Sequence, residues 1–417
     1  MLATRILTWN LAKLGLLFLP IFPALGEVGL ILALILIWKQ KYHQIVKQPF
    51  NQVLAILSLW LLVISCFAFS PKEAFLGLAN FLPFFAFFAG FQFLIQKPSH
   101  LRQLAWLIVI PSLPIVILGV GQLFWGWTTP MLFLGWELVA RGNPEERMAS
   151  VFMYANILAL YLLIVFSFSL GLCLDTWRQK NKPPWVICFL TLTLIGDGIG
   201  LVFTSSRNAW AIALCICVVF ALYLGWHWLV AGVATVAVSI LWAAFGPQPG
   251  RSWLRGIIPA YFWARLSDEM YGERPKEIMR ITQWRFAWEL TQKRPFFGWG
   301  LRNFTPLYGA QYQEWLGHPH NLPLMLMAET GIPATLILFG LVGWIIAKAV
   351  ILMRLFSVKR EREQLILFTY LVAFASCTLF NLLDVTIFDL RVNTLSWLLL
   401  AAIAGMVQRY QKILKRG

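Results

Sequence analysis

The chain has 417 residues, of which 59% are hydrophobic and only 12% are charged, and its formal net charge is +16. A soluble domain carries about a quarter charged residues, so this composition excludes an ordinary soluble globular protein. The positive charge does not indicate nucleic-acid binding either, because the basic residues lie in short connections between apolar segments.

Apolar runs recur along the chain, and each is long enough to cross a hydrocarbon core of about 30 Å. The first, residues 5–38, is too long for one span and rather short for two, and Pro20, Pro23 and Gly26 interrupt it. This stretch lacks a small-residue cleavage site, so two short helices are favoured over a removable signal peptide. Ten further spans are predicted at 51–70, 74–96, 103–125, 150–173, 185–203, 208–224, 226–245, 321–350, 364–385 and 392–408. The sequence therefore predicts an all-α polytopic membrane protein with eleven or twelve transmembrane helices.

Basic residues cluster in alternate connections, which the positive-inside rule assigns to the cytoplasm. These clusters lie at 39–47, 97–102, 178–182, 354–362 and 409–416. The C-terminus is therefore predicted to be cytoplasmic, and the larger connections 126–149, 204–207, 246–319 and 386–391 to face outward. We divide the chain into an N-terminal transmembrane bundle (1–245), a large periplasmic loop with an amphipathic helix (246–319) and C-terminal transmembrane helices (320–417).

All six cysteines lie in or at the ends of apolar spans, where cysteine behaves as a small hydrophobic residue. Cys215 and Cys217 lack the spacing of metal ligands. We therefore expect no disulfide and no metal site.

The outward 246–319 segment holds most of the groups that can do chemistry. Residues 278–294 have the pattern of a helix that stops at Pro295. On that helix Arg280 shares the aromatic face, whereas Arg285 and Glu289 lie on the far face as an i,i+4 ion pair. An inward arginine needs a partner, for which a bound anion and an acidic or carbonyl group are the two alternatives.

Arg207 is the second unusual cation. It follows Thr204-Ser205-Ser206, which have the character of capping residues for the span that begins near 208. A cation in the first turn lies at the positive end of the helix dipole, where it is unfavourable. An anionic ligand would relieve that repulsion. The alternative is an arginine that extends to the membrane interface.

His320 ends the polar segment and precedes a long apolar helix. Near its usual pKa of about 6.5, a histidine at this surface can act as a general base at neutral pH. His318 is an alternative base in a less constrained position. Gly331 lies about three turns below His320 on one face, which indicates either a smooth strip for a lipid chain or close helix packing.

Other ionisable residues lie near spans, where carboxylates are costly. We expect Asp197 to be protonated or hydrogen-bonded within the bundle. Asp384, Asp389 and Arg391 lie at an outward end and are expected to pair among themselves. Three more arginines face outward and are either ligands for glycan or phosphate or ordinary interface charges: Arg141, Arg147 and Arg302.

His320-Asn321, followed nine residues later by Gly331, is similar to the signature of the bacterial O-antigen ligase and O-antigen polymerase family. The resemblance extends to Phe203-Thr204-Ser205-Ser206-Arg207, to Arg280 through Trp284, and to Pro295-Phe296-Phe297-Gly298-Trp299-Gly300. It covers the layout from about 140 to 405. Each of these motifs is weak evidence by itself. Together, in this order and on one side of the membrane, they are fairly specific for the family. Ala334 stands where ligases commonly have Gly, Thr or Tyr. This departure is weak evidence about the subfamily and does not count against membership of the family.

The resemblance implies a GT-C-like fold and a membrane glycosyltransferase at the outer face of the bacterial inner membrane. The implied donor is a glycan on undecaprenyl diphosphate. In a ligase the acceptor is lipid A-core or another glycan carrier, and in an O-antigen or exopolysaccharide polymerase it is a second lipid-linked repeat. No nucleotide, metal or other cofactor is implied, because the lipid diphosphate is the leaving group.

The resemblance also implies roles for individual residues. His320 would deprotonate the acceptor hydroxyl, and Arg207 and Arg280 would hold the diphosphate and stabilise its developing charge. The further substrate-binding candidates are Asn321, Gly331, Arg302 and Arg141.

A transporter of bicarbonate or another small anion is the alternative from a different class, since one branch of the family was once described in those terms. Such a transporter should place paired charges or broken helices near the midplane, often in two related halves. The chain shows no internal repeat, and its arginines and His320 gather at the outer face. This distribution favours the enzyme.

Overall fold

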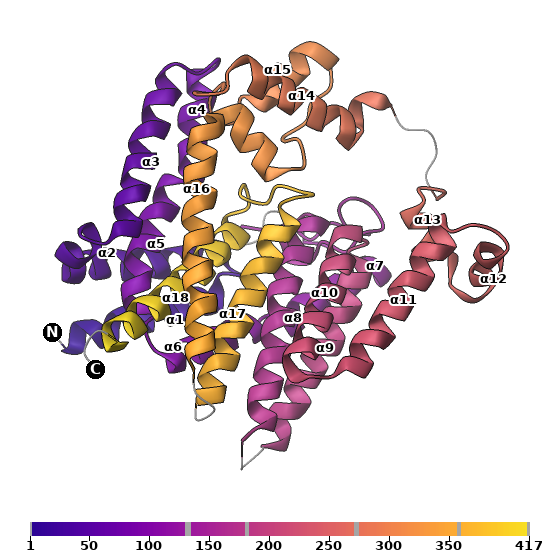
Figure 1. Ribbon diagram of the computed structural model, residues 1–417, viewed down its shortest axis with the longest axis horizontal. Helices are drawn as coiled ribbons and strands as arrows, with labels where there is room; N and C mark the ends of the chain where they lie inside the picture. The colour runs from indigo at the N-terminus through magenta and orange to yellow at the C-terminus, as the bar shows by residue number, and fades with distance from the viewer. Residues whose placement is uncertain (1, 130–134, 180–182, 271–274, 357–359, 415–417) are drawn as a thin grey trace.

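The computed structural model describes residues 2–129, 135–179, 183–270, 275–356 and 360–414, and every regular element in these ranges is a helix (Figure 1). Within these described ranges, eleven segments are long and apolar enough to cross a membrane. The predicted all-α polytopic architecture is therefore confirmed, and the ten spans predicted after residue 38 each correspond to one of these segments.

The first half of the bundle is formed by α1 to α9. Their bounds are α1 Leu2–Phe18, α2 Pro23–Val46, α3 Pro49–Cys66, α4 Pro71–Gly77, η1 Leu78–Asn80, α5 Leu82–Leu94, α6 Pro98–Val109, α7 Ser112–Phe124, η2 Ser150–Phe152, α8 Ala155–Trp177 and α9 Pro184–Phe203. The 71–94 and 98–124 segments each act as one span with an internal interruption. In the second of these the interruption lies at Pro111, because proline cannot continue the helical hydrogen-bond ladder.

The second half contains the outer segment and the last spans. Their bounds are α10 Arg207–Leu224, α11 His227–Phe245, α12 Gly250–Ile257, α13 Ala260–Leu266, η3 Lys276–Ile278, α14 Arg280–Lys293, α15 Phe304–Tyr312, α16 Leu322–Leu355, α17 Glu361–Phe380 and α18 Leu390–Leu414. Figure 1 shows α14 and α15 above one end of α16, with α12 and α13 at the corresponding end of α11.

The N-terminal stretch forms two helices, as its internal prolines and glycine predicted. α1 and α2 are separated by the turn at 19–22 and pack closely against each other. A Cβ on Gly26 would lie only 2.5 Å from the Cα of Leu19, so glycine is what lets the two backbones approach.

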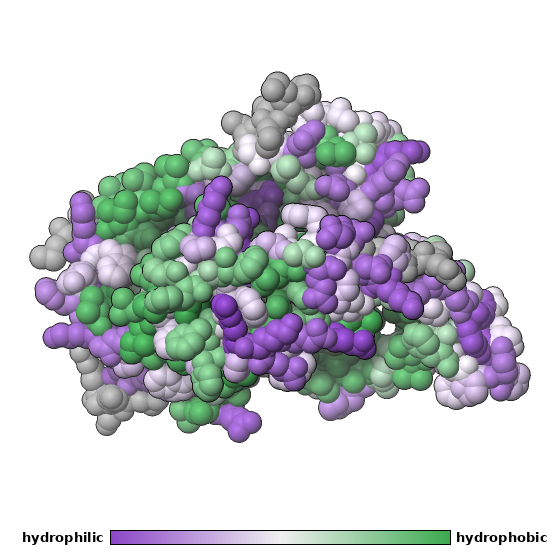
Figure 2. All heavy atoms as spheres, turned by 90° about the horizontal axis from the view of Figure 1, so that it is seen from above, coloured by the Kyte–Doolittle hydropathy of each residue, from purple (hydrophilic) through white to green (hydrophobic). Residues whose placement is uncertain are grey.

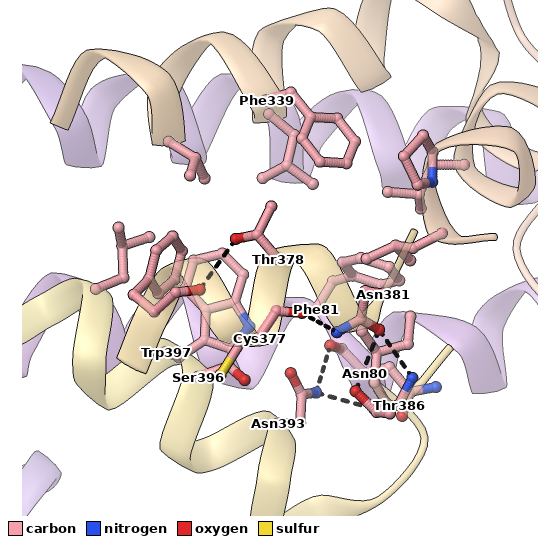
Figure 3. A pocket seen from close by; sticks show the side chains of 18 of the residues that line it. Asn80, Phe81, Phe339, Cys377, Thr378, Asn381, Thr386, Asn393, Ser396 and Trp397 are labelled. Carbon is pink, nitrogen blue, oxygen red and sulfur yellow. Dashed lines mark hydrogen bonds between the residues drawn. The ribbon is translucent and has the colours of Figure 1, made fainter. Parts of the chain in front are cut away.

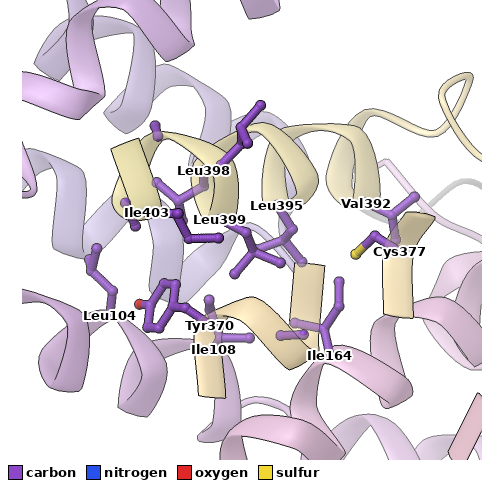
Figure 4. Close-up of a cluster of buried hydrophobic side chains, with 14 of the residues drawn as sticks. Leu104, Ile108, Ile164, Tyr370, Cys377, Val392, Leu395, Leu398, Leu399 and Ile403 are labelled. Carbon is purple, nitrogen blue, oxygen red and sulfur yellow. The ribbon is translucent and has the colours of Figure 1, made fainter. Parts of the chain in front are cut away.

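The centre of the bundle is formed by α8, α17 and α18 together with α5 and α6. α8 is apolar on all sides, and most of its side chains are buried. Figure 4 shows part of this core, where Leu104 and Ile108 from α6 meet Ile164, Tyr370 and Leu399. The Tyr370 hydroxyl donates to the Leu101 carbonyl, so its one polar atom is satisfied inside the core. This packed block is the rigid support for the outer ends of α8, α17 and α18.

An ion network around the buried Asp175 joins three of these helices. The Asp175 carboxylate accepts from Arg102 at 3.1 Å and from Arg362 at 2.8 Å. The network brings residues of α6, α8 and α17 together at one end of the bundle. Two of the predicted cytoplasmic basic clusters therefore lie at the same end.

The outer segment has a small hydrophobic core of its own. Phe286, Leu290, Phe304 and Tyr308 pack on Ala328 of α16. Along α14, Ala287 and Thr291 are buried and Arg285 is exposed, as predicted, but Arg280 at the start of the predicted inner face is exposed. This packing fixes α14 and α15 to the first turns of α16.

α16 is broken at Gly331, where the backbone has φ 83° and ψ 161°. The turn at 295–300 docks on the break, with Trp299 N donating to the Ala328 carbonyl and Ile332 N donating to the Pro295 carbonyl. A Cβ on Gly331 would lie 2.2 Å from the Phe296 carbonyl oxygen. The strip predicted for a lipid chain is therefore wrong at this glycine, because backbone from the outer segment covers it. Close packing explains the residue.

We expect Gly331→Ala to lower the thermal unfolding midpoint in detergent, because this backbone region is accessible to glycine almost alone and costs about 1–3 kcal/mol otherwise. Gly340→Ala in the same helix is the matched control, since a Cβ added at Gly340 would have no other atom within 4 Å. The control should be neutral or stabilising by up to about 1 kcal/mol. Equal midpoints for the two variants would contradict this account of the break.

Candidate functional site

A polar cleft lies among the outer ends of α8, α9, α10 and α13, the start of α14, and the two connections that carry His320 and Asp384. It offers about 1050 Å³ of space for water-sized molecules. Seen from the side of α14 and α15, hydrophilic side chains gather towards the α10–α13 side, whereas the α2–α3 side is mainly hydrophobic (Figure 2). The residues that line the polar cleft include Arg147, Asn156, Ser205, Ser206, Arg207, Arg265, Asp268, Arg280, His320 and Asp384.

His320 is held in a defined orientation. Its backbone has a left-handed φ of 51°, and its N–H donates to Nδ1 of His318. Nδ1 of the His320 ring lies 3.0 Å from Oδ1 of Asp384. Because an ionised carboxylate only accepts hydrogen bonds, this contact assigns the proton to Nδ1 and leaves Nε2 as a proton acceptor.

Asn321 and Trp284 position the segment that carries His320. The Asn321 side chain caps α16 by accepting from Leu324 N at 2.9 Å, and its amide donates to the Leu382 carbonyl. Trp284 of α14 donates its indole N–H to the Pro319 carbonyl at 2.9 Å. The histidine is thus fixed to both the α17–α18 connection and the outer segment.

Asp384 is buried with an exposure of only 3%, yet it is well satisfied. Oδ2 accepts from the Asn156 amide, and Oδ1 also accepts from Val385 N at 2.8 Å. Burial alone would raise the pKa of the Asp384 carboxyl, but the hydrogen bond and charge of His320 outweigh it and hold the pKa below its usual value. The carboxylate is therefore ionised at neutral pH.

The predicted pairing of Asp384 with Asp389 and Arg391 is only partly right. Asp389 and Arg391 do pair, at 2.9 Å, but Asp384 turns instead to His320. Arg391 also donates to the Val151 carbonyl at 2.7 Å, which holds its guanidinium on the core. Residues 64 apart in the chain are thereby brought together as a histidine–carboxylate pair.

Asn156 links the His320–Asp384 pair to Arg147. Its Oδ1 accepts from Arg147, whose Nε also donates to the Thr204 carbonyl at 2.8 Å. Asn156 therefore has its donor and acceptor ends fixed by different partners. Arg147, an outward arginine in the sequence, lines the cleft and joins the turn before α10 to the start of α8.

Arg207 and Arg280 lie in the same cleft as His320. Ser206 caps α10 by accepting from Ala209 N, and Arg207 follows as the first helical residue. The Arg207 guanidinium donates to the Arg265 carbonyl and pairs with Asp268 at 2.8 Å. The protein therefore supplies an acidic partner to Arg207 in this structure.

Arg280 differs from Arg207 in its contacts. In the part of the chain that the structure describes, no carboxylate forms an ion pair with Arg280. The pKa of the Arg280 guanidinium is lowered, mainly by burial. The charge of Asp384 opposes this effect, and the charge of Arg207 adds to it. Arg280 remains protonated even so, because an arginine starts above a pKa of about 12. A cation in a cleft, near a second arginine, is a suitable contact for an anionic ligand.

Residues 189–339 match a family model described as O-antigen ligase. This part of the chain is therefore similar to the O-antigen ligase family. The match confirms the resemblance drawn from the motifs, and it includes Arg207, Arg280 and His320. A search of curated proteins finds no match to the chain. The protein is thus a multi-pass membrane protein with an O-antigen ligase domain.

Two parts of the site lie outside the matched ligase domain. Asp384 follows it, whereas Arg147 and Asn156 precede it, and sequence reasoning missed the roles of Asp384 and Asn156 at His320. The one signal in the sequence was Asp384 itself, a carboxylate at the end of a span. Its partner depends on how the α17–α18 connection folds over the ligase domain.

Three substrate-binding candidates are not among the residues that line the cleft. Arg141 forms an exposed pair with Glu145, which lies at the edge of the cleft, whereas Arg302 pairs with Glu73 of α4 at 3.2 Å. Gly331 packs under the 295–300 turn. Asn321 adjoins His320, where its side chain serves as the helix cap.

His318, His320 and Asp384 of this site place their ligand atoms within 4.8 Å of one another, a grouping that could hold a metal ion. Cysteine spacing, on which the prediction of no metal site was based, gives no indication of this group. In the structure Nδ1 of His318 accepts from His320 N, and Nδ1 of His320 bonds Asp384. The ring nitrogens that face these partners are therefore engaged in hydrogen bonds.

His318 is expected to make the ligase domain sensitive to acid. Burial, followed by the charge of His320, lowers the pKa of His318 from 6.5 to about 4. Between these values the unfolded chain binds a proton that the folded chain excludes, so stability is lost as pH falls from about 6.5 towards 4, by at most about 3 kcal/mol.

His318→Asn keeps an acceptor for His320 N and does not titrate. Unfolding midpoints measured between pH 7 and 4 should therefore fall less steeply for this variant than for the wild type. Parallel slopes would show that His318 is not the responsible group.

Proposed function

We propose that this protein is a glycosyltransferase of the O-antigen ligase type that moves a glycan from undecaprenyl diphosphate to an acceptor hydroxyl. The observation that carries the proposal is the placement of a histidine–carboxylate pair and two arginines around one cleft. A general base and a site for a diphosphate leaving group are the two requirements of such a transfer.

In the proposed reaction Nε2 of His320 takes the proton of the acceptor hydroxyl. The acceptor oxygen attacks the anomeric carbon, and the bond from that carbon to the diphosphate breaks. The electron pair stays on the diphosphate, whose added charge Arg207 and Arg280 stabilise. Asp384, already ionised, stabilises the imidazolium that forms. No metal is required in this scheme, because the arginines supply the positive charge.

We further propose that Asn156 and Arg147 act as positioning residues. Asn156 donates to Oδ2 of Asp384, which leaves Oδ1 of the carboxylate for His320. The network would keep the His320 ring in one tautomer and one orientation.

The cleft is proposed to face the periplasm across the bacterial inner membrane. The Arg102–Asp175–Arg362 network supports this orientation, because it joins two basic connections at the ends of α6, α8 and α17 remote from the cleft. The outer segment 246–319 would be the periplasmic loop between the two groups of spans, with α14 and α15 docked on α16.

The direct test is transfer in vitro with protein purified into nanodiscs, an undecaprenyl-diphosphate-linked oligosaccharide and candidate acceptors. The expected result is a glycosylated acceptor together with free undecaprenyl diphosphate. One added oligosaccharide indicates a ligase, whereas a ladder of repeats indicates a polymerase. If no donor and acceptor gave transfer and the protein mediated anion uptake into liposomes, the enzyme proposal would be rejected in favour of a transporter.

A further inference from the structure

A second cavity lies on the other side of the first turn of α16 from the cleft. It is lined by η1, α16, α17 and α18, and Figure 3 shows Phe339 on one side facing Thr378 and Trp397 on the other. The cavity offers about 120 Å³ of space for water-sized molecules, and about 840 Å³ of empty space when its open part is counted. None of the described residues that line it is charged; they include Leu322, Phe339, Val342, Thr378, Asn393 and Trp397. We call it the apolar chamber.

Several polar side chains of the apolar chamber, among them Asn381, Thr386 and Thr378, are engaged within the protein. The Asn381 amide donates to the Cys377 carbonyl, and its Oδ1 accepts from the Thr386 backbone and hydroxyl. Asn393 donates to the Asn80 and Ile387 carbonyls, and the Thr378 hydroxyl donates to the carbonyl of Phe374. These walls therefore offer little hydrogen bonding to an occupant, and a hydrocarbon fits them better than a sugar or a phosphate.

The chamber adjoins the histidine from the side opposite the arginines. Leu322 lies two residues after His320 and lines the chamber, and its N–H donates to the Asn381 carbonyl at 2.9 Å. On the other side, Asn208, next to Arg207, donates to the Phe380 carbonyl at 2.9 Å. The end of α17 thus separates the charged cleft from the apolar chamber.

The shape of the chamber suits a chain along the helices. Its lining on α18 runs from Asn393 to Leu400, which is about 10 Å of helix at 1.5 Å per residue. An empty apolar cavity forfeits packing contacts, so an apolar occupant is favoured there. In a membrane the available filler is the hydrocarbon chain of a lipid.

We propose that the apolar chamber holds the hydrocarbon chain of a lipid-linked acceptor, whose polar head then reaches His320. This proposal rests on the proposed function, in which the arginine-lined cleft is taken by the diphosphate of the donor. Two substrates would then meet at the histidine from opposite sides. The acceptor class assigned is a hydroxyl-bearing amphiphile with at least one long alkyl or isoprenyl chain.

A photolabelling experiment tests the chamber without requiring turnover. The probe is hexadecyl glucoside with a diazirine near the end of its chain, added to the full-length protein in nanodiscs. Labels are expected on residues of α16, α17 and α18 that line the chamber. Val342→Trp, or Thr378→Phe as a second variant, should fill the space and cut this labelling about tenfold or more. Leu336→Trp is the matched control, because Leu336 lies on the same helix with 65% of its surface exposed.

Acceptor kinetics provide a second readout. Val342→Trp should raise the apparent KM for the long-chain acceptor by about tenfold or more, since burial of a few methylenes is lost. It should leave transfer to a short, water-soluble acceptor within about twofold, because the arginines and His320 are untouched.

The failures of the two proposals are distinguishable. Wild-type transfer without chamber labelling, or labelling unchanged by Val342→Trp, would overturn the chamber assignment and leave the proposed function standing. Labelling that Val342→Trp abolishes, without transfer from any donor, would support the chamber and count against the proposed function.

Discussion

Replacing His320 by asparagine is expected to reduce glycan transfer by about 10²–10⁴-fold, the usual contribution of a general base. Asparagine tolerates the left-handed backbone at this position, where φ is 51°, and can still hydrogen-bond Asp384. It cannot accept the proton of the acceptor. The measurement is initial rates of transfer from an undecaprenyl-diphosphate-linked oligosaccharide, with protein folding checked by the thermal unfolding midpoint.

His227→Asn is the control for this substitution, because His227 is an exposed histidine at the start of α11 and does not line the cleft. The control should keep wild-type rates. If His320→Asn also retained them, with both variants folded, another group would have to be the base. Transfer that is lost equally in both variants would indicate a general loss of integrity rather than a role for His320.

Arg280→Ala is expected to lower kcat by about 10²–10³-fold, the range seen when one donor to a developing oxyanion is removed. The physical reason is that the donor's leaving group gains negative charge as its bond to the sugar breaks. Arg280→Lys should restore only part of the rate, because an ammonium keeps the charge but not the planar fork that fits phosphate oxygens.

Arg285→Ala is the matched control for Arg280, since Arg285 lies five residues later on the exposed face of the same helix. The control should transfer glycan at close to the wild-type rate. Equal losses in Arg280→Ala and Arg285→Ala would point to the helix rather than to the guanidinium. A fully active Arg280→Ala would remove Arg280 from the proposed site.

Several features of this protein were accessible from local patterns. The spans followed from length and hydropathy, and the break between α1 and α2 from Pro20 and Pro23. The orientation of α14 followed from helical periodicity, which put Ala287 inside and Arg285 outside. These predictions succeeded because they depend on residues within one or two helical turns.

The sequence could not decide which distant residues meet. Gly331 was compatible with a lipid strip and with close packing, and only the docking of the 295–300 turn on α16 distinguished them. Arg141 and Arg302 were attractive from charge alone, yet each pairs with a glutamate, and neither lines the cleft. Charge and exposure do not specify a partner, because many side chains of opposite sign are within reach in the unfolded chain.

The sequence by itself determined an all-helical membrane protein with the ligase motif and the ligase-domain residues Arg207, Arg280 and His320. The tertiary structure decided that Asp384 orients His320 and that Asn156, 228 residues away from Asp384, holds that carboxylate. It also created the apolar chamber, whose walls come from η1, α16, α17 and α18. The physical reason is that a helix is specified by hydrogen bonds and periodicity within a few residues, whereas a site requires side chains from several helices to pack at one place.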